Sequence, residues 1–164
     1  MIARWLTINV VTVMLIFLWS LHQGNNSTYI LIGKIIAQVA FILLLINVNM
    51  YFVFLLIRKS KGRNVKVRLA KISKRMMSYH IPIAVTAASL VSIHAAIMIS
   101  LHYEHLWKAK TVSGVISLGL LPLLLYSGLL RRWKATGYRR TFHYIMAFVF
   151  IIHIFIHIFT KGSS

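Results

Sequence analysis

The hydrophobic stretch TFHYIMAFVFIIHIFIHIFT, residues 141–160, decides the fold class because it is long enough to cross a bilayer and yet carries three histidines. A membrane-spanning helix needs about 20 predominantly apolar residues. A neutral imidazole in hydrocarbon still requires a hydrogen-bond partner or a metal, so His143, His153 and His157 indicate a function. His143 and His157 are fourteen residues apart, about four helical turns, so they lie on nearly the same face, separated along the axis by roughly 20 Å.

The predicted span at residues 76–101 repeats this interval, because His80 and His94 are also fourteen residues apart. Two helices that carry histidines at matched depths can offer two stacked pairs of axial ligands. The residues between the histidines fit this purpose, since small side chains leave space for a bulky group and a phenylalanine separates the two depths. These residues are Ala84, Ala87, Ala88, Val91 and Ala95 in the earlier span, and Ala147, Phe150 and Ile154 in the last one.

Composition places the chain among integral membrane proteins. Its 164 residues are 59% hydrophobic, and its mean hydropathy of +0.79 is far above that of an ordinary soluble domain. Cysteine is absent, which excludes disulfides, iron–sulfur clusters and covalent haem attachment through thiols. We expect one all-α domain, a bundle of about five transmembrane helices, with spans at about residues 2–21, 29–57, 76–101, 111–130 and 141–160.

The positive charges indicate membrane topology rather than nucleic-acid binding, because the formal net charge of +18 lies in short segments beside apolar spans. Residues 58–75 contain nine Lys or Arg and residues 131–140 contain five, whereas the loops on the opposite side contain none and two. The positive-inside rule therefore predicts that the N-terminus and both basic segments face the cytoplasm and that the C-terminus lies outside. We expect a multi-pass protein of the plasma membrane, in contact with lipid.

This orientation places His80 and His143 near the inner surface and His94 and His157 near the outer surface. If the two helices are neighbours, each depth presents two histidines across a gap that a planar macrocycle with a central iron can fill. Haem is favoured over zinc or copper, because those ions need three or four donors that converge on one point. His153, one turn before His157, is an alternative outer ligand.

Polar and small residues in the other spans have structural interpretations. Pro122 and the glycines at positions 114, 119 and 128 are expected to shape and pack the span at residues 111–130. Amide side chains in the first two spans are expected to form hydrogen bonds between helices. These amides are Asn9, Gln38, Asn47 and Asn49.

Residues near the two membrane surfaces have less specific interpretations. His22, His102, His105 and the only acidic residue, Glu104, lie on the outer side; they are either solvated loop residues or a site for a proton, a quinone or a metal-ion acceptor. On the inner side, basic residues close to the histidines could neutralise haem propionates, and both basic segments could steer an acidic soluble partner to the membrane. The residues placed for propionates are Lys74, Arg75, Arg139 and Arg140.

One helix carries two histidines fourteen residues apart, the next helix but one carries two more, and the second pair begins in the motif RRTFHY at residues 139–144. This histidine pattern resembles that of the ferric reductase-like transmembrane domain. Ferric reductases, NADPH oxidases and the haem-binding membrane subunit of the bacterial methionine-sulfoxide repair system share this domain. The resemblance covers about residues 76–161. It implies a helical bundle that carries b-type haems and passes electrons across the membrane, with His80, His94, His143 and His157 as ligands of the haem iron.

Larger members of that family append a flavin and nicotinamide domain that these 164 residues lack, so we expect a separate electron donor. The prediction is a dihaem b-type cytochrome, with two molecules of haem b, that transfers electrons from a cytoplasmic-side flavoprotein or menaquinol to an outer acceptor as the membrane component of an oxidoreductase. A b561-type cytochrome, a non-redox membrane anchor or assembly subunit, and a metal-ion or proton transporter are the alternatives. Intramembrane carboxylates, which such transporters use, are scarce here. Association into oligomers or with other subunits is open.

Overall fold

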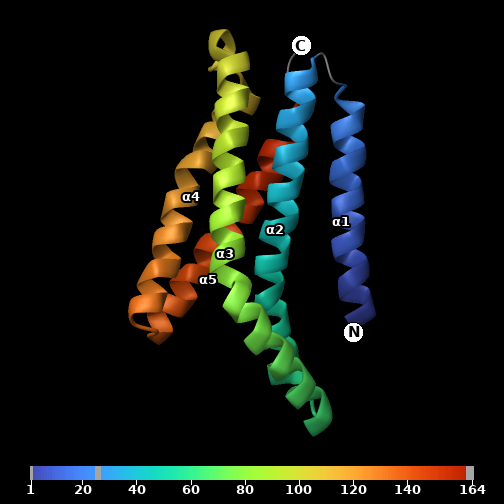
Figure 1. The fold of residues 1–164 in the computed structure, drawn as a ribbon, viewed down its shortest axis with the longest axis vertical. Coiled ribbons are helices and arrows are strands. Elements are labelled where there is room, and N and C mark those ends of the chain that lie inside the picture. Colours follow the sequence, from blue (N-terminus) through green and yellow to red (C-terminus); the bar gives the residue numbers. More distant parts are fainter. Residues whose placement is uncertain (1, 25–26, 162–164) are drawn as a thin grey trace.

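The computed structural model describes the backbone of residues 2–24 and 27–161, and the side chains of that part except those of residues 2–6 and 105. The described chain is helical and contains no strand, which confirms the predicted all-α fold (Figure 1). Its elements are α1 (Ile2–His22), α2 (Thr28–Lys59), α3 (Arg63–Leu101), the short 3-10 helix η1 (Tyr103–His105), α4 (Ala109–Trp133) and α5 (Gly137–Phe159).

Four helices, α2, α3, α4 and α5, are long and apolar enough to cross a membrane, so the chain is a multi-pass membrane protein. Helix α1 corresponds to the remaining expected span, at residues 2–21. Its described side chains form an apolar stretch, Thr7–His22, that is shorter than those of the other four helices. Large apolar side chains such as Val85 and Ile152 are more than half exposed. In a bilayer, such side chains contact lipid rather than water.

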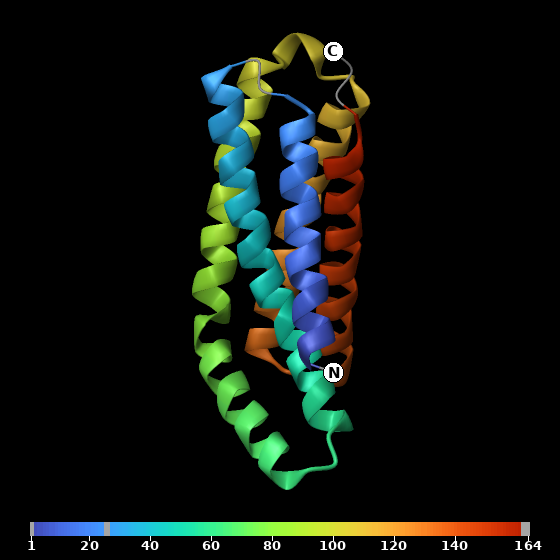
Figure 2. The ribbon, with the colours of Figure 1, turned by 90° about the vertical axis from the view of Figure 1, so that its right-hand side faces the viewer.

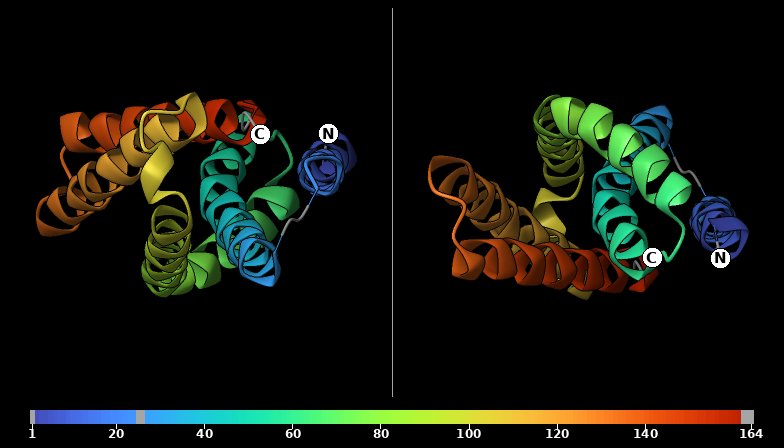
Figure 3. Two further views of the ribbon diagram at one scale, coloured as in Figure 1. Left: turned by 90° about the horizontal axis from the view of Figure 1, so that it is seen from above. Right: turned by 90° about the horizontal axis from the view of Figure 1, so that it is seen from below.

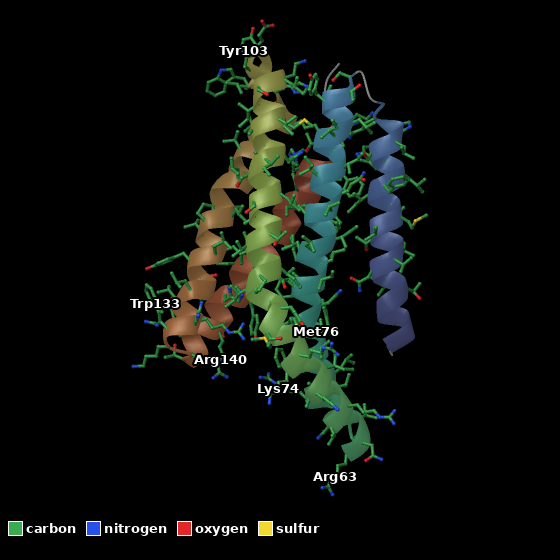
Figure 4. All side chains as sticks on the ribbon, viewed as in Figure 1. Arg63, Lys74, Met76, Tyr103, Trp133 and Arg140 are labelled. Carbon is green, nitrogen blue, oxygen red and sulfur yellow. The ribbon has the colours of Figure 1, made fainter. Side chains whose placement is uncertain are left out.

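The two basic segments lie at one end of the bundle, here called the basic end, and the turn around Tyr103 lies at the opposite end, here called the far end. Figure 4 shows Arg63, Lys74, Trp133 and Arg140 at the basic end and Tyr103 at the far end. Both α3 and α5 start at the basic end and run in the same direction (Figures 1 and 2). This parallel direction is the one that the charge distribution predicts.

Helix α3 begins earlier than the sequence predicts. Residues 58–75 are expected to form a loop, but only residues 60–62 are non-helical, and α3 starts at Arg63. Lysine, arginine, leucine and alanine favour helix, and no proline or glycine interrupts the chain between Gly62 and Pro82, so nothing ends the helix there. The first turns of α3 therefore project beyond the bundle at the basic end, and α3 bends near their junction with the rest (Figure 2).

Helix α2 packs along α3, and α4 packs along α5, so these four helices form two pairs, with α1 at the edge beside α2 (Figure 3). Polar side chains link α1 to the rest. Asn49 Nδ2 donates to Asn9 Oδ1 at 3.1 Å, as the sequence predicts for these amides. Trp19 Nε1 donates to the Ile158 carbonyl oxygen at 3.0 Å, which ties α1 to the end of α5.

An apolar layer fills the middle of the bundle. Its buried members are Leu121 and Leu124 of α4 and Phe150 of α5, of which Phe150 is only 2% exposed. Phe150 lies seven residues from both His143 and His157, so the layer separates the two histidine depths. Residues from α2, α3, α4 and α5 complete it: Leu44, Ala88, Val91, Leu120, Met146, Ala147 and Ile154.

Candidate functional site: two histidine pairs

The four histidines of α3 and α5 form two levels. His80 and His143, nearer the basic end, are here called the first level, and His94 and His157, nearer the far end, are called the second level. In the first level the two ring centroids are 6.3 Å apart and the ring planes meet at 81°. Two metal–nitrogen bonds of about 2 Å, with roughly 1 Å from each nitrogen to its ring centroid, would separate two axial imidazoles by about 6 Å. The first level therefore has the spacing of an axial pair.

The second level lies one interval further along both helices. His94 and His157 are close enough for their charges to interact, and other helices hold their rings. His94 Nδ1 lies 2.8 Å from the Gly33 carbonyl oxygen of α2. His157 Nδ1 lies 3.0 Å from Ser113 Oγ and 3.2 Å from the Lys110 carbonyl oxygen of α4. The structure thus brings together the neighbours that the spacing predicts at both depths.

The hydrogen bonds of Ser127 favour one tautomer of His143. Ser127 Oγ donates its only hydrogen to the Leu124 carbonyl oxygen at 2.6 Å. The same Oγ atom lies 2.9 Å from His143 Nδ1 and therefore accepts a hydrogen bond from it. His143 Nδ1 therefore carries the ring proton, and Nε2 keeps its lone pair. A metal-bound histidine has this arrangement, in which one ring nitrogen donates a hydrogen bond and the other coordinates.

The same reasoning applies to the second level. Ser113 Oγ donates to the Lys110 carbonyl oxygen at 2.8 Å, so it accepts from His157 Nδ1. The Gly33 carbonyl oxygen has no hydrogen to give, so His94 Nδ1 also carries a proton. Within the described chain, the rings that donate through Nδ1 make no hydrogen bond through Nε2. Three histidines thus keep a nitrogen lone pair available for a metal.

His80 is the exception among the four. Its Nδ1 atom is buried and has no hydrogen-bond partner within the described residues. Its backbone carbonyl oxygen accepts from Asn47 Nδ2 of α2 at 3.2 Å, which fixes the helix turn but not the ring. His80 is therefore held by its backbone and by packing, whereas the other three are also held through their rings.

Helix α4 carries the dipeptide Ser-Gly twice, at residues 113–114 and 127–128, with the fourteen-residue interval of the histidines. Each glycine makes room for the ring that the preceding serine binds. A Cβ atom at Gly114 would lie 3.0 Å from His157 Cε1, and one at Gly128 would lie 3.3 Å from His143 Cε1. The sequence predicts only a packing role for these glycines. The repeat is visible in the sequence, but only the contact between α4 and α5 gives it a meaning.

Arg131 is the basic residue whose charge acts on both first-level histidines. Its guanidinium carbon lies 5.6 Å from the centroid of the Tyr144 ring, which is the distance of a cation–π contact. In the sequence, Arg131 is only one of the five positive charges of residues 131–140. Its nearness to His80 and His143 makes it a further candidate partner for a carboxylate bound at the first level.

The four basic residues predicted as propionate partners make other contacts. Arg139 and Arg140 donate through Nη1 and Nη2 to backbone carbonyl oxygens beside the turn between α4 and α5, at 3.0 and 3.1 Å. Lys74 and Arg75 are exposed on α3 near the basic end. Their proposed contact with propionates stays a prediction.

His153 lacks the support that His157 has. No hydrogen bond within the described residues holds its ring, and its buried Nε2 atom has no partner there. His157, one turn later, donates through Nδ1 to a hydroxyl or a carbonyl of α4. The geometry therefore favours His157 over His153 as the second-level ligand.

The described residues that the sequence places at the outer membrane surface do not form a metal site. His22 is exposed, His102 Nδ1 donates to a backbone carbonyl at 3.0 Å, and Glu104 accepts from the Tyr103 hydroxyl at 2.9 Å. The side chain of His105 lies outside the described part. Among the described residues, no three His, Cys, Asp or Glu side chains are grouped so that they could hold a metal ion.

Comparison with known proteins identifies no relative: no family model matches the chain, and no curated protein or solved structure matches it. The chemistry of the site therefore rests on its own geometry. Each level brings two imidazoles together, and three of the four rings have a free Nε2 lone pair. Two such imidazoles are the kind of donors that could occupy the two axial positions of an iron porphyrin.

Proposed function

We propose that this chain is a membrane cytochrome that holds one haem b at each histidine level and conducts electrons across the bilayer. The observation that carries the proposal is the first level, where two rings with centroids 6.3 Å apart match the spacing of two axial ligands. His80 and His143 would ligate one haem, and His94 and His157 the other. When bound, haem supplies one-electron chemistry through the ferric and ferrous states of its iron.

The surrounding residues would hold the ligands and set their electronic properties. Hydrogen bonds from the ring Nδ1 atoms to Ser127, Ser113 and Gly33 orient three of the imidazoles and make them more basic ligands. The apolar layer around Phe150 would separate the two haems with hydrocarbon side chains. No side chain is required to act as a general acid or base, because the task of this protein is to space and tune two cofactors.

The proposed direction of electron flow follows from charge. The positive-inside rule assigns the basic end to the cytoplasm, with α1 as a fifth span, the N-terminus inside and the C-terminus outside. Electrons would enter at the first level from a separate flavoprotein or menaquinol and leave from the second level to an external acceptor, in the plasma membrane. The resemblance of the histidine pattern to the ferric reductase-like domain supports this direction.

A reduced-minus-oxidised absorption spectrum of the purified protein, together with a haem-to-protein ratio, tests the proposal. We expect two haems per chain, both reducible by dithionite, when the protein is produced with an adequate haem supply. A colourless protein that is folded and monodisperse would refute the proposal and favour the non-redox anchor. Metal-dependent or proton-dependent flux into liposomes, without haem, would favour the transporter.

A further inference from the structure

Two lysines from different helices converge on the end of α1. Lys34 of α2 donates through Nζ to the carbonyl oxygen of Ser20, at 3.4 Å, and to that of Gly24. Lys110 of α4 donates through Nζ to Gln23 Oε1 at 2.6 Å. Gly24, with a φ of 68°, ends α1 at this place. The two ammonium groups thus contact the same short segment, and their charges act on each other.

Among the described residues, no carboxylate contacts this pair. The only acidic residue of the chain is Glu104, which accepts from the Tyr103 hydroxyl instead. Lys110 also lies in the first turn of α4, where the helix dipole is positive and an acidic residue would be expected, yet that turn contains none. Two half-buried cations, one of them in the first turn of a helix, are unfavourable unless an anion joins them.

Gln23 independently indicates a missing acceptor. Its Oε1 atom accepts from Lys110, and its Nε2 atom is buried with no hydrogen-bond partner within the described residues. An unpaired buried amide N–H is costly, and the group that would satisfy it must be an acceptor. An oxygen anion can accept from this amide and from both ammonium groups.

The same place adjoins the second histidine level. The charge of Lys110 acts on both His94 and His157, and its backbone carbonyl oxygen lies 3.2 Å from His157 Nδ1. A cofactor held by those two histidines would therefore have its periphery near the two lysines. A haem carries two propionate carboxylates on its periphery, and charge-assisted hydrogen bonds to carboxylates are among the strongest in proteins.

We propose that Lys34, Lys110 and Gln23 form a carboxylate-binding site, and that its ligand is a propionate of the haem held by His94 and His157. The identity of the ligand as a haem propionate rests on the proposed function. The existence of a site for an oxygen anion does not, because it follows from the two lysines and Gln23. The same donors would bind a dissolved oxyanion such as phosphate, so the experiment separates these two sources.

The test uses the full chain, purified without haem and reconstituted in nanodiscs. His143→Ala, which leaves both ligands only at the second level, is titrated with ferric haem b and with its dimethyl ester, which has no free carboxylate. We expect haem to bind about tenfold more tightly than the ester. The preference should disappear when Lys34→Gln and Lys110→Gln are added, and Gln23→Leu should remove part of it.

Lys161→Gln is the matched control, because Lys161 is an exposed lysine just beyond the end of α5, and it should keep the full preference. Each lysine variant is also made in a chain that keeps His143. Retention of the first-level haem in that chain shows that the variant is folded. The single variant Lys110→Gln, which leaves the contacts of Lys34 with α1 intact, should lose most of the preference as well. A preference that persists in the folded double variant would overturn the inference.

A second titration, of the haem-free wild-type chain with inorganic phosphate, separates the sources. If haem and ester bind equally well, the propionate is not the ligand. Phosphate binding that requires both lysines would then assign the site to a dissolved oxyanion. If phosphate does not bind either, the site is refuted. If the wild-type chain binds neither haem nor ester, the proposed function fails. The phosphate titration still decides whether the oxyanion site exists.

Discussion

The two histidine levels are built on the same helices with the same spacing, but they differ in how their rings are held. In the second level both rings donate through Nδ1 to protein acceptors. In the first level only His143 does so, and His80 Nδ1 has no partner in the described chain. A hydrogen bond at the second ring nitrogen fixes a ligand and raises its basicity. We therefore expect two haems that differ in affinity and in midpoint potential, the first being less firmly held.

Removal of one ligand per level should have the largest effect. His143→Ala should lose the first haem and keep the second, and His157→Ala should do the reverse, because each haem needs both ligands of its own level. The haem-to-protein ratio should fall by about half in each variant. His153→Ala is the matched control from the same helix and should keep both haems. Loss of one haem in the control, with full retention in His157→Ala, would assign the second level to His153.

Substitution of the glycines of the Ser-Gly repeat should have the next largest effect. Gly114→Ala should lower occupancy of the second haem more than Gly128→Ala lowers that of the first, because the added Cβ would lie 3.0 Å rather than 3.3 Å from a ring carbon. Haem titration measures both. Gly119→Ala, whose Cβ would meet nothing within 4 Å, should keep both haems and stabilise the helix by up to about 1 kcal/mol. Equal occupancy in all three variants would contradict the positioning role.

Loss of the serine hydroxyls should shift potentials rather than occupancy. Ser127→Ala removes the acceptor of His143, whereas Ser113→Ala leaves His157 the Lys110 carbonyl oxygen at 3.2 Å. A ligand without its hydrogen bond is less basic and stabilises the ferric state less, so the midpoint potential should rise. We expect a rise of roughly 20–65 mV at the first haem, from a bond worth about 0.5–1.5 kcal/mol, and less at the second.

Redox titration of both haems measures this difference. The matched control is Ser117→Ala, because the Ser117 hydroxyl donates only to the Ser113 carbonyl oxygen, at 2.9 Å. It should leave both potentials unchanged. A larger shift in Ser113→Ala than in Ser127→Ala would show that the Lys110 carbonyl does not serve as the second acceptor.

Arg131→Gln should produce the smallest change. Reduction adds an electron near Arg131, so loss of this positive charge should lower the midpoint potential of the first haem and leave the second unaffected. The guanidinium is only partly buried, so the shift should be smaller than that of Ser127→Ala and should shrink at high salt. Arg132→Gln, an exposed neighbour, is the control. An equal shift at both haems would show that Arg131 does not act on the first level specifically.

The histidine levels could be predicted from the sequence because fourteen residues is close to four turns of an α-helix. That interval puts His80 and His94 on one face, and the charge bias gives α3 and α5 the same direction. Periodicity therefore sets both the depth and the pairing of the rings, including the first-level contact at 6.3 Å. Their role as haem ligands stays a prediction that the experiments above test.

The groups around the rings could not be predicted, because they depend on how the helices rotate against one another. Serine and glycine are common in any packed membrane helix, so Ser113 and Ser127 carry no signal until α4 is placed against α5. Arg131 and Arg139 belong to one basic segment, yet α4 continues to Trp133, which keeps Arg131 within the helix and near the first level. Sequence position alone does not distinguish these two arginines.

The distance between the two levels has an electrical consequence. Fourteen residues of helix span about 21 Å, about two thirds of a hydrocarbon core roughly 30 Å thick, and the layer around Phe150 fills that interval with apolar side chains. An electron that moves between the levels would therefore cross about two thirds of the membrane potential. The corresponding electrical energy is about 1.5 kcal/mol per 100 mV. In the proposed orientation, with the cytoplasm negative, outward flow would be downhill in this field. Each electron delivered to the far end would therefore partly discharge the membrane, and the rate of delivery should depend on voltage.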